Sequence, residues 1–336
     1  MKEKLKPSYD TKRSVLGKIL PLDTPFRVTL DSSEICNFKC NYCFRYDQPS
    51  ENWGYARKNQ IMSWDIFERA VQQLREFPSE PRVIALSGSG EPLCNKNIPK
   101  MAKYIKDVGF QCKTEIHTNA ALLNETNVKA IAECGLNKIV ISLQGLNSLS
   151  YEKVASTKIN FEYFYQQLSN LYKYKSSETV INIKIVEDAV EDNGKEVFYE
   201  LFAPIADNVF VEKVIALWQQ QRTYDEDANT QSNKFGIDLG EISRCPITFT
   251  NLTISPDGNI WPCCVIDPPF CLGNVNETKL LDAWNSEQRK EFLKRNLIEG
   301  HNCHEKCQNC YFPKGYVKTE EDIIDPYYTE ILQRIR

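Results

Sequence analysis

The sequence predicts an α/β fold in which a parallel sheet is followed by a small cysteine-rich unit. Between residues 25 and 218, short apolar runs alternate six times with amphipathic stretches. This alternation is typical of strand–helix units joined by right-handed crossovers. Seven of the 13 cysteines then fall between residues 245 and 310, where the alternation has stopped. We therefore expect the two parts of the chain to form different structures.

The strands are predicted from β-branched and apolar runs bounded by turn residues. They cover residues 26–33, 82–88, 112–119, 138–145, 179–186 and 208–217. Helices are predicted between them from amphipathic periodicity, at residues 63–77, 97–109, 124–135, 148–155, 161–174 and 195–206. In the first helix, Ser63 is the expected N-cap.

The chain divides into five predicted segments. These are an N-terminal extension (1–24), the α/β core (25–218), a polar linker (219–244), the cysteine-rich unit (245–320) and a C-terminal helix (321–336). The cysteine-rich unit is predicted to consist of a β-hairpin plus a helix, and the apolar residues of the hairpin flank an Asp257-Gly258 turn.

The composition indicates a globular protein without a nucleic-acid or membrane partner. Of the 336 residues, 42% are hydrophobic and 26% are charged, and the formal net charge of −4 leaves no basic footprint. No apolar run approaches the ~20 residues of a membrane span, and the polar start "MKEKLKPSYDTKR" is not a signal peptide. We therefore expect a cytoplasmic protein. In a reducing cytosol, cysteine clusters are better explained by metal or cluster ligation than by disulfides.

Three cysteines in the stretch "EICNFKCNYCFRYD" form a loop directly after the first strand. Cys36, Cys40 and Cys43 lie within eight residues, and Tyr42 precedes the last of them. Three thiolates are one ligand short of a closed tetrahedral site, which leaves two interpretations. One is a structural zinc with a fourth ligand from elsewhere, such as His117. The other is a [4Fe–4S] cluster with one iron left open, on the strand-end face where barrels of this kind place their chemistry.

The CxxxCxΦC spacing of this loop, with Φ aromatic, resembles the radical S-adenosylmethionine (SAM) superfamily. The resemblance implies a partial (β/α)6 TIM-like barrel and a [4Fe–4S] cluster on Cys36, Cys40 and Cys43. In that family the amino and carboxylate groups of SAM chelate the open iron. An electron from the reduced cluster then cleaves the S–C5′ bond and releases a 5′-deoxyadenosyl radical.

A second segment, "LSGSGEPL" (residues 86–93), follows the second strand and resembles the GGEP motif of the same family. Its four positions are Ser89, Gly90, Glu91 and Pro92, with serine in place of the first glycine. The family uses backbone carbonyls and the acid of this segment to bind the methionine ammonium group of SAM. Taken alone, the segment would be explained as a glycine-rich turn between a strand and a helix.

Two further strand ends resemble the family more weakly. "HTNAALLN" resembles a strand that ends in TN and continues with glycine, which makes Asn119 a cofactor-binding residue and leaves Ala120 in the glycine position. "ISLQGLN" resembles a segment in which Ser142 and Gln144 face the ribose or the substrate, although many relatives carry aspartate where Gln144 stands. Tyr42, beside the cluster, completes the expected cofactor-binding set.

The pattern C-x12-G-x4-C from Cys245 to Cys263, followed by "CHEKCQNC", resembles the SPASM and twitch extensions that carry auxiliary iron–sulfur clusters. Here the SPASM run C-x2-C-x5-C-x3-C is shortened to C-x3-C-x2-C, which is closer to the twitch form with a single auxiliary [4Fe–4S] cluster. The implied ligands are Cys245, Cys263, Cys307 and Cys310, with Cys303 as the substitute for one of them. A zinc ribbon is the other interpretation, because thiolate tetrads bind both metals.

Two more cysteines are candidate hydrogen-atom donors to a substrate radical. Cys94 follows the Glu91 turn, and Cys264 adjoins Cys263. Cys112 and Cys134 are instead expected to be small buried residues.

The resemblance implies hydrogen-atom abstraction from an unactivated C–H bond, and an auxiliary cluster could accept a second electron. We therefore expect a radical SAM oxidoreductase that dehydrogenates or epimerises a carbinol carbon of a sugar- or aminocyclitol-like molecule. Its partners would be SAM, the substrate and a flavodoxin- or ferredoxin-type electron donor. The alternative is a maturase or epimerase of ribosomal peptides, although the 35 residues before Cys36 are too few for a peptide-recognition domain. A remoter alternative is a non-catalytic zinc- or iron–sulfur-binding module.

Overall fold

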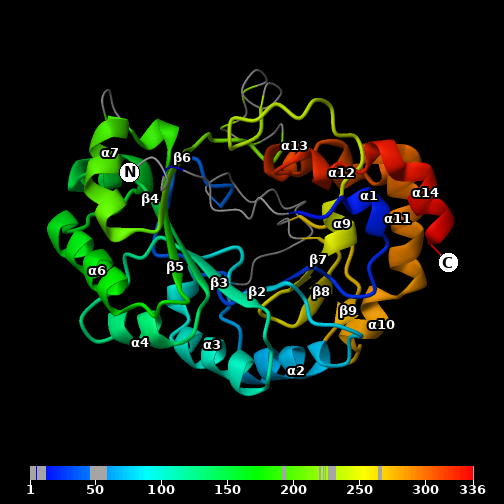
Figure 1. Ribbon diagram of the computed structural model, residues 1–336, viewed down its shortest axis with the longest axis horizontal. Coiled ribbons are helices and arrows are strands. Elements are labelled where there is room, and N and C mark those ends of the chain that lie inside the picture. Colours follow the sequence, from blue (N-terminus) through cyan, green and yellow to red (C-terminus); the bar gives the residue numbers. More distant parts are fainter. Residues whose placement is uncertain are drawn as a thin grey trace.

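A single curved sheet organises the molecule. The computed structural model describes residue 5 and residues 13–45, 59–190, 194–218, 221, 223, 225, 232–263 and 267–335. Within these ranges, nine strands form one sheet in the order β6-β5-β4-β3-β2-β1-β7-β8-β9. Figure 1 shows this sheet curving through the middle of the molecule, with helices along its outer side.

The first six strands are parallel, and each pairs with its neighbour in the sequence. They are β1 (Arg27–Leu30), β2 (Val83–Ala85), β3 (Lys113–Thr118), β4 (Lys138–Leu143), β5 (Val180–Val186) and β6 (Asn208–Glu212). All six lie inside the ranges predicted from the sequence. The predicted fold class, a partial (β/α)6 TIM-like barrel, is confirmed.

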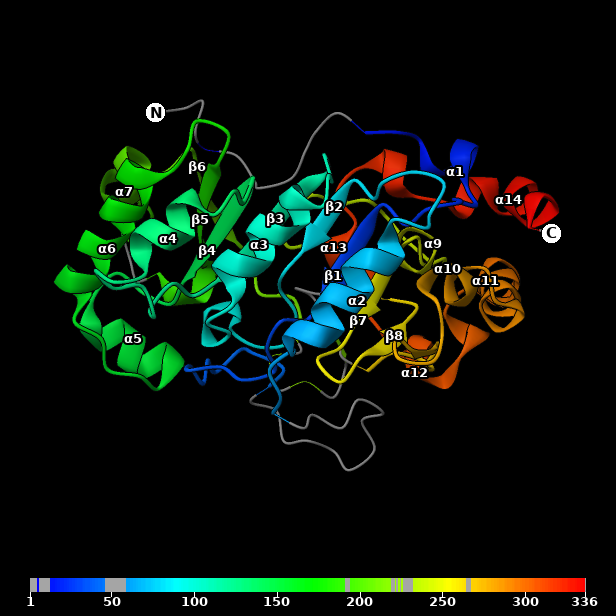
Figure 2. The ribbon, with the colours of Figure 1, turned by 90° about the horizontal axis from the view of Figure 1, so that it is seen from below.

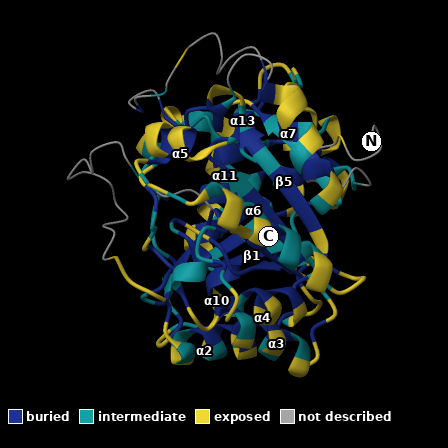
Figure 3. Ribbon diagram, turned by 90° about the vertical axis from the view of Figure 1, so that its left-hand side faces the viewer, coloured by how far each residue is buried: buried dark blue, intermediate teal, exposed yellow. Residues whose placement is uncertain are grey.

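Helices of the core cover the outer face of these strands, as Figure 2 shows. They are α2 (Trp64–Leu74), α3 (Ile98–Asp107), α4 (Val128–Glu133), α5 (Ser148–Ala155), α6 (Phe161–Tyr174) and α7 (Gly194–Phe202). Their inward faces and the outward faces of the strands form one buried core. Figure 3 shows the strands buried and the outer sides of the helices exposed. The amphipathic periodicity therefore predicted the correct faces.

The cysteine-rich unit continues the same sheet. A short helix α9 (Ile247–Thr250) leads into β7 (Asn251–Ile254), which pairs in parallel with β1. The predicted hairpin follows, with β8 (Asn259–Trp261) antiparallel to β7 and Gly258 in the left-handed region at φ 86°. β9 (Gly273–Asn274) adds a last antiparallel strand. The predicted hairpin is thus attached to the barrel, whereas the boundaries between the five segments stay predictions.

The C-terminal part of the chain is helical and lies at the β9 end of the sheet (Figure 1). Its helices are α10 (Leu280–Trp284), α11 (Glu287–Glu299), α12 (Glu305–Gln308), α13 (Phe312–Tyr316) and α14 (Tyr328–Arg334). A second small core forms where Leu293 and Leu297 of α11 pack with Ile331 of α14 and with Leu16 of α1 (Leu16–Ile19). α14 lies inside the predicted C-terminal helix, and α11 is a helix after the hairpin, for which the sequence predicted no bounds.

Among the described helices, none is long and apolar enough to cross a lipid bilayer.

The N-cap of α2 provides a test of the predicted helix start. Ser63 Oγ accepts a hydrogen bond from the Ile66 backbone N at 3.3 Å. Replacing Ser63 with alanine removes this acceptor, and we expect the free energy of unfolding to fall by about 1 kcal/mol. Ser63→Thr should keep most of the stability, because threonine also caps helices. The measurement is urea denaturation of both variants, and an unchanged midpoint for Ser63→Ala would contradict the assigned cap.

Candidate functional site

The cluster loop, residues 31–45, leaves the C-terminal end of β1 and carries three neighbouring thiols. Cys36, Cys40 and Cys43 are half-buried, and the Cys43 backbone N donates to Cys40 O at 3.0 Å. Burial raises the pKa of the Cys36 thiol and that of Cys40, and the thiols of Cys43 and Cys36 raise the pKa of Cys40 further. Three thiolates here therefore require a compensating positive charge, which a metal centre supplies.

The number of donors in the loop fits a cluster better than a single zinc ion. The loop supplies three cysteines, one ligand short of a tetrahedral zinc site. In a [4Fe–4S] cluster each thiolate binds its own iron, so three thiolates leave one iron open. His117, the zinc ligand considered above, has its Nε2 3.2 Å from Glu115 Oε1. The donor set of the loop fits a cluster.

The turn after β2 lies against the cluster loop, and Gly90 makes this contact possible. The Glu91 backbone N donates to Ile35 O at 2.8 Å. A Cβ atom built on Gly90 would come within 2.5 Å of Ile35 O and of Ser33 O. Only glycine allows two backbones to approach so closely. Glycine is therefore required at position 90 because the GEP turn (Gly90, Glu91 and Pro92) packs against the cluster loop.

The Glu91 carboxylate joins the turn after β2 to the end of β3. Its Oε1 accepts from Thr118 Oγ1 at 2.5 Å and from Leu93 N at 3.0 Å, and its Oε2 accepts from Asn119 N at 2.7 Å. Burial raises the pKa of Glu91 to about 7, against the effect of these three hydrogen bonds. Glu91, which is predicted to bind the SAM ammonium group, therefore also links the ends of β2 and β3 through hydrogen bonds.

Asp31 supports the same turn and was missed by the sequence reasoning. Its Oδ2 accepts from Ser89 N at 3.0 Å and from Ser89 Oγ at 2.7 Å. Burial raises the pKa of Asp31 to about 6. A Cβ atom on Gly88 would lie 2.1 Å from Asp31 Cγ, so glycine is required there too. The available signal was an acidic residue immediately after a buried strand.

Asn119 lies at the edge of the cluster loop, as predicted. Its Nδ2 donates to Asn37 Oδ1 at 2.9 Å and lies 4.0 Å from Cys36 Sγ. Ala120, in the glycine position of the resemblance, adopts φ 60°. Alanine is therefore held in the left-handed region that glycine enters without strain.

Tyr42 connects the cluster loop to the end of β4. Its Oη donates to Gln144 Oε1, and Gln144 Nε2 donates to Ser142 O at 3.1 Å. Gln221 Nε2 donates to Tyr42 O at 3.3 Å from the linker side. The structure thus brings together all three residues that the sequence assigned to this edge of the site.

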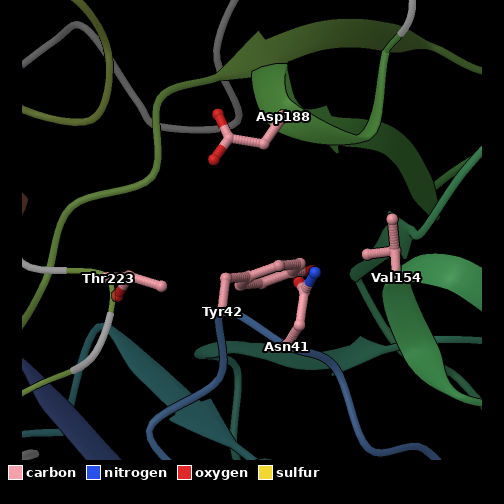
Figure 4. A pocket seen from close by; sticks show the side chains of 5 residues that line it. All are labelled: Asn41, Tyr42, Val154, Asp188 and Thr223. Atoms are coloured by element: carbon pink, nitrogen blue, oxygen red, sulfur yellow. The ribbon is translucent and has the colours of Figure 1, made fainter.

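Two cavities meet at Tyr42. The first, of about 320 Å³, is lined by Asn41, Tyr42, Val154, Asp188 and Thr223. Figure 4 shows the Asp188 carboxylate facing the Tyr42 ring across this space. The second, of about 230 Å³, is lined by Tyr42 and Cys43 and by residues of β4, β5 and β6. The cluster loop therefore borders a cavity on each side, both partly open to solvent.

The C-terminal cysteines form a second thiol group. The thiols of Cys303 and Cys307 are hydrogen bonded, and Cys245 and Cys263 act electrostatically on Cys307. Cys303 is fully buried, and Asn296 Nδ2 lies 3.9 Å from its Sγ. The Cys310 backbone N donates to Cys307 O at 3.2 Å. The structure thus places Cys303, the predicted substitute, within the group.

The remaining cysteines have different surroundings. Cys94 lies in the turn Pro92–Cys94, within electrostatic range of Glu91 and Cys36, and burial raises the pKa of its thiol to about 11. Cys271 Sγ donates to Gly273 O at 3.2 Å. Cys112 and Cys134 are half-buried against the core. Cys264, the other candidate hydrogen-atom donor, lies outside the described residues.

The comparison with known families agrees with both thiol groups. Residues 30–193 match the radical SAM superfamily, and residues 245–311 match the SPASM iron–sulfur cluster-binding domain. The chain belongs to the radical SAM superfamily. With its SPASM domain, this radical SAM protein carries a [4Fe–4S] cluster that binds SAM, together with auxiliary iron–sulfur clusters.

Curated relatives include cyclases of the superfamily. This radical SAM protein is 22% identical to the GTP 3′,8-cyclase of Aquifex aeolicus, over 83% of this chain and 97% of the cyclase. It is 34% identical to the probable GTP 3′,8-cyclase of Methanococcus vannielii, over 35% of this chain and 36% of that protein.

Two solved structures show the same fold at 18% identity. Streptococcus suis SuiB bound to S-adenosylmethionine has a TM-score of 0.62, over 93% of this radical SAM protein and 79% of SuiB. BtrN in complex with AdoMet and 2-DOIA has a TM-score of 0.55, over 88% of this chain and 97% of BtrN.

The grouping of thiols around Cys307 can be tested by cluster content. We expect Cys303→Ser to lower the iron and sulfide of the reconstituted protein by one auxiliary cluster, about four irons per chain, because the Cys303 thiol contacts Cys307. Chemical iron and sulfide analysis measures this loss. Cys271→Ser is the control, since its thiol bonds to a backbone carbonyl. If Cys310→Ser loses the cluster while Cys303→Ser keeps it, the set predicted from the sequence is the correct one.

Proposed function

We propose that this protein reductively cleaves SAM and uses the resulting radical to oxidise or epimerise a carbinol carbon of a sugar- or aminocyclitol-like molecule. The observation that carries the proposal is the contact of the GEP turn with the three-thiol loop, through Glu91 N and Ile35 O at 2.8 Å. The [4Fe–4S] cluster bound by Cys36, Cys40 and Cys43 would supply the electron that breaks the S–C5′ bond of SAM. The residues around the cluster would bind SAM and the substrate and hold them in the orientation that the reaction needs.

The predicted cofactor-binding residues lie at the ends of β1, β2, β3 and β4, where they would contact different parts of SAM. Ser89, Gly90, Glu91 and Pro92 would hold the methionine end, where the Oε2 of Glu91 accepts one hydrogen bond from Asn119 N and keeps a lone pair. Tyr42, Asn119, Ser142 and Gln144 would hold the ribose and adenine side. The Tyr42–Gln144 hydrogen bond fixes both side chains before a ligand binds, which lowers the entropy cost of binding.

The auxiliary cluster favours a net oxidation. Cys245, Cys263 and Cys307, with Cys303 or Cys310 as the fourth ligand, would hold it. When bound, this cluster would supply an acceptor for one electron from the substrate radical, and loss of the hydroxyl proton to solvent would complete the dehydrogenation. A flavodoxin- or ferredoxin-type protein would return electrons to the first cluster. Where the substrate radical is quenched instead, Cys94 or Cys264 would donate the hydrogen atom and the outcome would be epimerisation.

The extent of the matches supports a small substrate without separating it from a peptide, because anSMEcpe with bound AdoMet and Cp18Cys peptide also aligns over 96% of its chain. The GTP 3′,8-cyclase relative aligns over 97% of its length, and BtrN with 2-DOIA over 97% of its chain. SuiB bound to its precursor peptide SuiA aligns over 72% of its chain. A peptide maturase or epimerase is the second candidate, supported by the fold it shares with SuiB. A non-catalytic metal module would leave the Gly90 contact and both cavities without a role.

The three-thiol loop is tested by cysteine substitution. We expect the triple variant Cys36→Ala, Cys40→Ala, Cys43→Ala to release no 5′-deoxyadenosine from SAM, because it cannot hold the first cluster. The measurement is chromatography of the reaction after anaerobic reconstitution and reduction with dithionite. Cys112→Ala and Cys134→Ala, which change half-buried thiols elsewhere, should keep the activity. If the triple variant still cleaves SAM, the assignment of this loop as the ligand of the SAM-binding cluster is wrong.

The substrate class is tested by isotope transfer. Candidate polyols deuterated at the carbinol carbon should transfer deuterium into 5′-deoxyadenosine, because the radical takes that hydrogen atom. Mass spectrometry detects the transfer, and a ketone product separates dehydrogenation from epimerisation. Transfer from a deuterated peptide and from no small molecule would favour the maturase.

A further inference from the structure

The inner face of the sheet carries an ion triad that the cofactor chemistry does not use. Three isoleucines of β5 pack in the core beneath the helices, so Lys184 points to the opposite, inner face. Glu212 ends β6 beside it. Lys184 Nζ lies 2.5 Å from Glu212 Oε2, and Lys234 Nζ lies 3.4 Å from Glu212 Oε1. Burial alone would raise the pKa of Glu212, but the two lysines outweigh it and lower the pKa to about 2. The carboxylate is therefore fully ionised and shared between two cations.

The triad lines the cavity of about 230 Å³ that reaches the cluster loop. Tyr42 and Cys43 line the same cavity from the loop, and Ser142 lines it from β4. The triad and the cluster loop therefore face one shared cavity.

Positive charge exceeds negative charge around this cavity. Among the described residues that line it, three cations, Lys184, Lys213 and Lys234, oppose one carboxylate, Glu212. Burial lowers the pKa values of Lys234 and Lys318 to about 8, so both keep their charge at neutral pH. Burial also lowers the pKa of His117, so this ring adds no charge. The excess is two positive charges in a chain whose formal net charge is −4.

Lys318 adds positive charge close to the triad. The residue is half-buried, and burial, followed by the charges of Arg13, Arg27 and Lys234, lowers the pKa of its ammonium group. An anion in the cavity would be attracted by this charge as well.

We propose that this cavity binds an anionic group of the substrate, a phosphate or a carboxylate, and so restricts the enzyme to anionic substrates. The inference rests on the proposed function and narrows its substrate class. A sugar phosphate or a sugar acid fits the excess positive charge, whereas an ammonium-bearing aminocyclitol is repelled. The cavity is smaller than the roughly 300–1,000 Å³ of sites that enclose a whole ligand. It therefore holds the charged end, and the reacting carbon lies toward Tyr42 and Cys43.

The test is isothermal titration of inorganic phosphate into the reconstituted holoenzyme saturated with SAM, at low ionic strength to limit screening. We expect the wild type to bind phosphate, and K184M and K234M to bind it at least about tenfold more weakly. E212Q should bind phosphate more tightly, because the competing carboxylate is gone. Acetate in a parallel titration distinguishes a phosphate site from a carboxylate site by which anion binds more tightly.

K195M is the matched control, because it breaks the exposed Lys195–Glu187 pair of 2.6 Å outside the cavity, and it should bind phosphate like the wild type. Tighter binding by E212Q cannot arise from a collapsed fold, so it supports the proposal even where a lysine variant folds poorly. The proposal is overturned if the wild type binds neither anion, or if all cavity variants bind alike. Loss of SAM affinity in K184M and K234M also overturns it, because the lysines would then serve the SAM carboxylate. Failure of the reduced wild type to release 5′-deoxyadenosine instead overturns the proposed function.

Discussion

The backbone contact between the GEP turn and the cluster loop is the constraint on which the site depends. Because no side chain fits at Gly90, the turn after β2 lies directly on Ser33 and Ile35. That position lets the Glu91 carboxylate reach the end of β3, where it takes Thr118 Oγ1 and Asn119 N. The ends of three strands are thereby held as one unit. A cluster carried by this loop would be placed rigidly against the groups that bind its ligand, without a separate closing motion.

The fold could be predicted where its signals are local. Six strands, their covering helices, the Ser63 cap and the Gly258 turn each follow from a few neighbouring residues, whose periodicity or turn chemistry acts over short range. The parallel pairing of β7 with β1 could not be predicted, because it joins segments more than 200 residues apart with no local mark of register. The bounds of helix α11 were not predicted, because its face toward the core is narrow and most of its residues are polar.

The same distinction applies to the site. The cluster loop, Glu91 and the strand-end residues were identifiable because their spacing in the chain is itself the signal. The cationic cavity was not, because Lys184 and Lys213 lie in two different predicted strands and Lys234 lies in a stretch interpreted as a linker. Only closure of the barrel brings them together. A partial signal existed, since Lys184 and Glu212 break the apolar runs of β5 and β6 at inward positions.

The two sides of Tyr42 have opposite electrostatic character, and this bears on how a substrate is oriented. On one side, the Asp188 carboxylate faces the ring across the first cavity (Figure 4). On the other, Lys184 and Lys234 share Glu212 in the second cavity. With the proposed anion site, a negatively charged molecule would be attracted by the two lysines and repelled by Asp188. It would therefore enter with its anion toward the triad, and its neutral carbons would lie beside the cluster loop. Charge would then orient the substrate, and the distance between the triad and Cys43 would determine which hydrogen atom lies near the reacting centre.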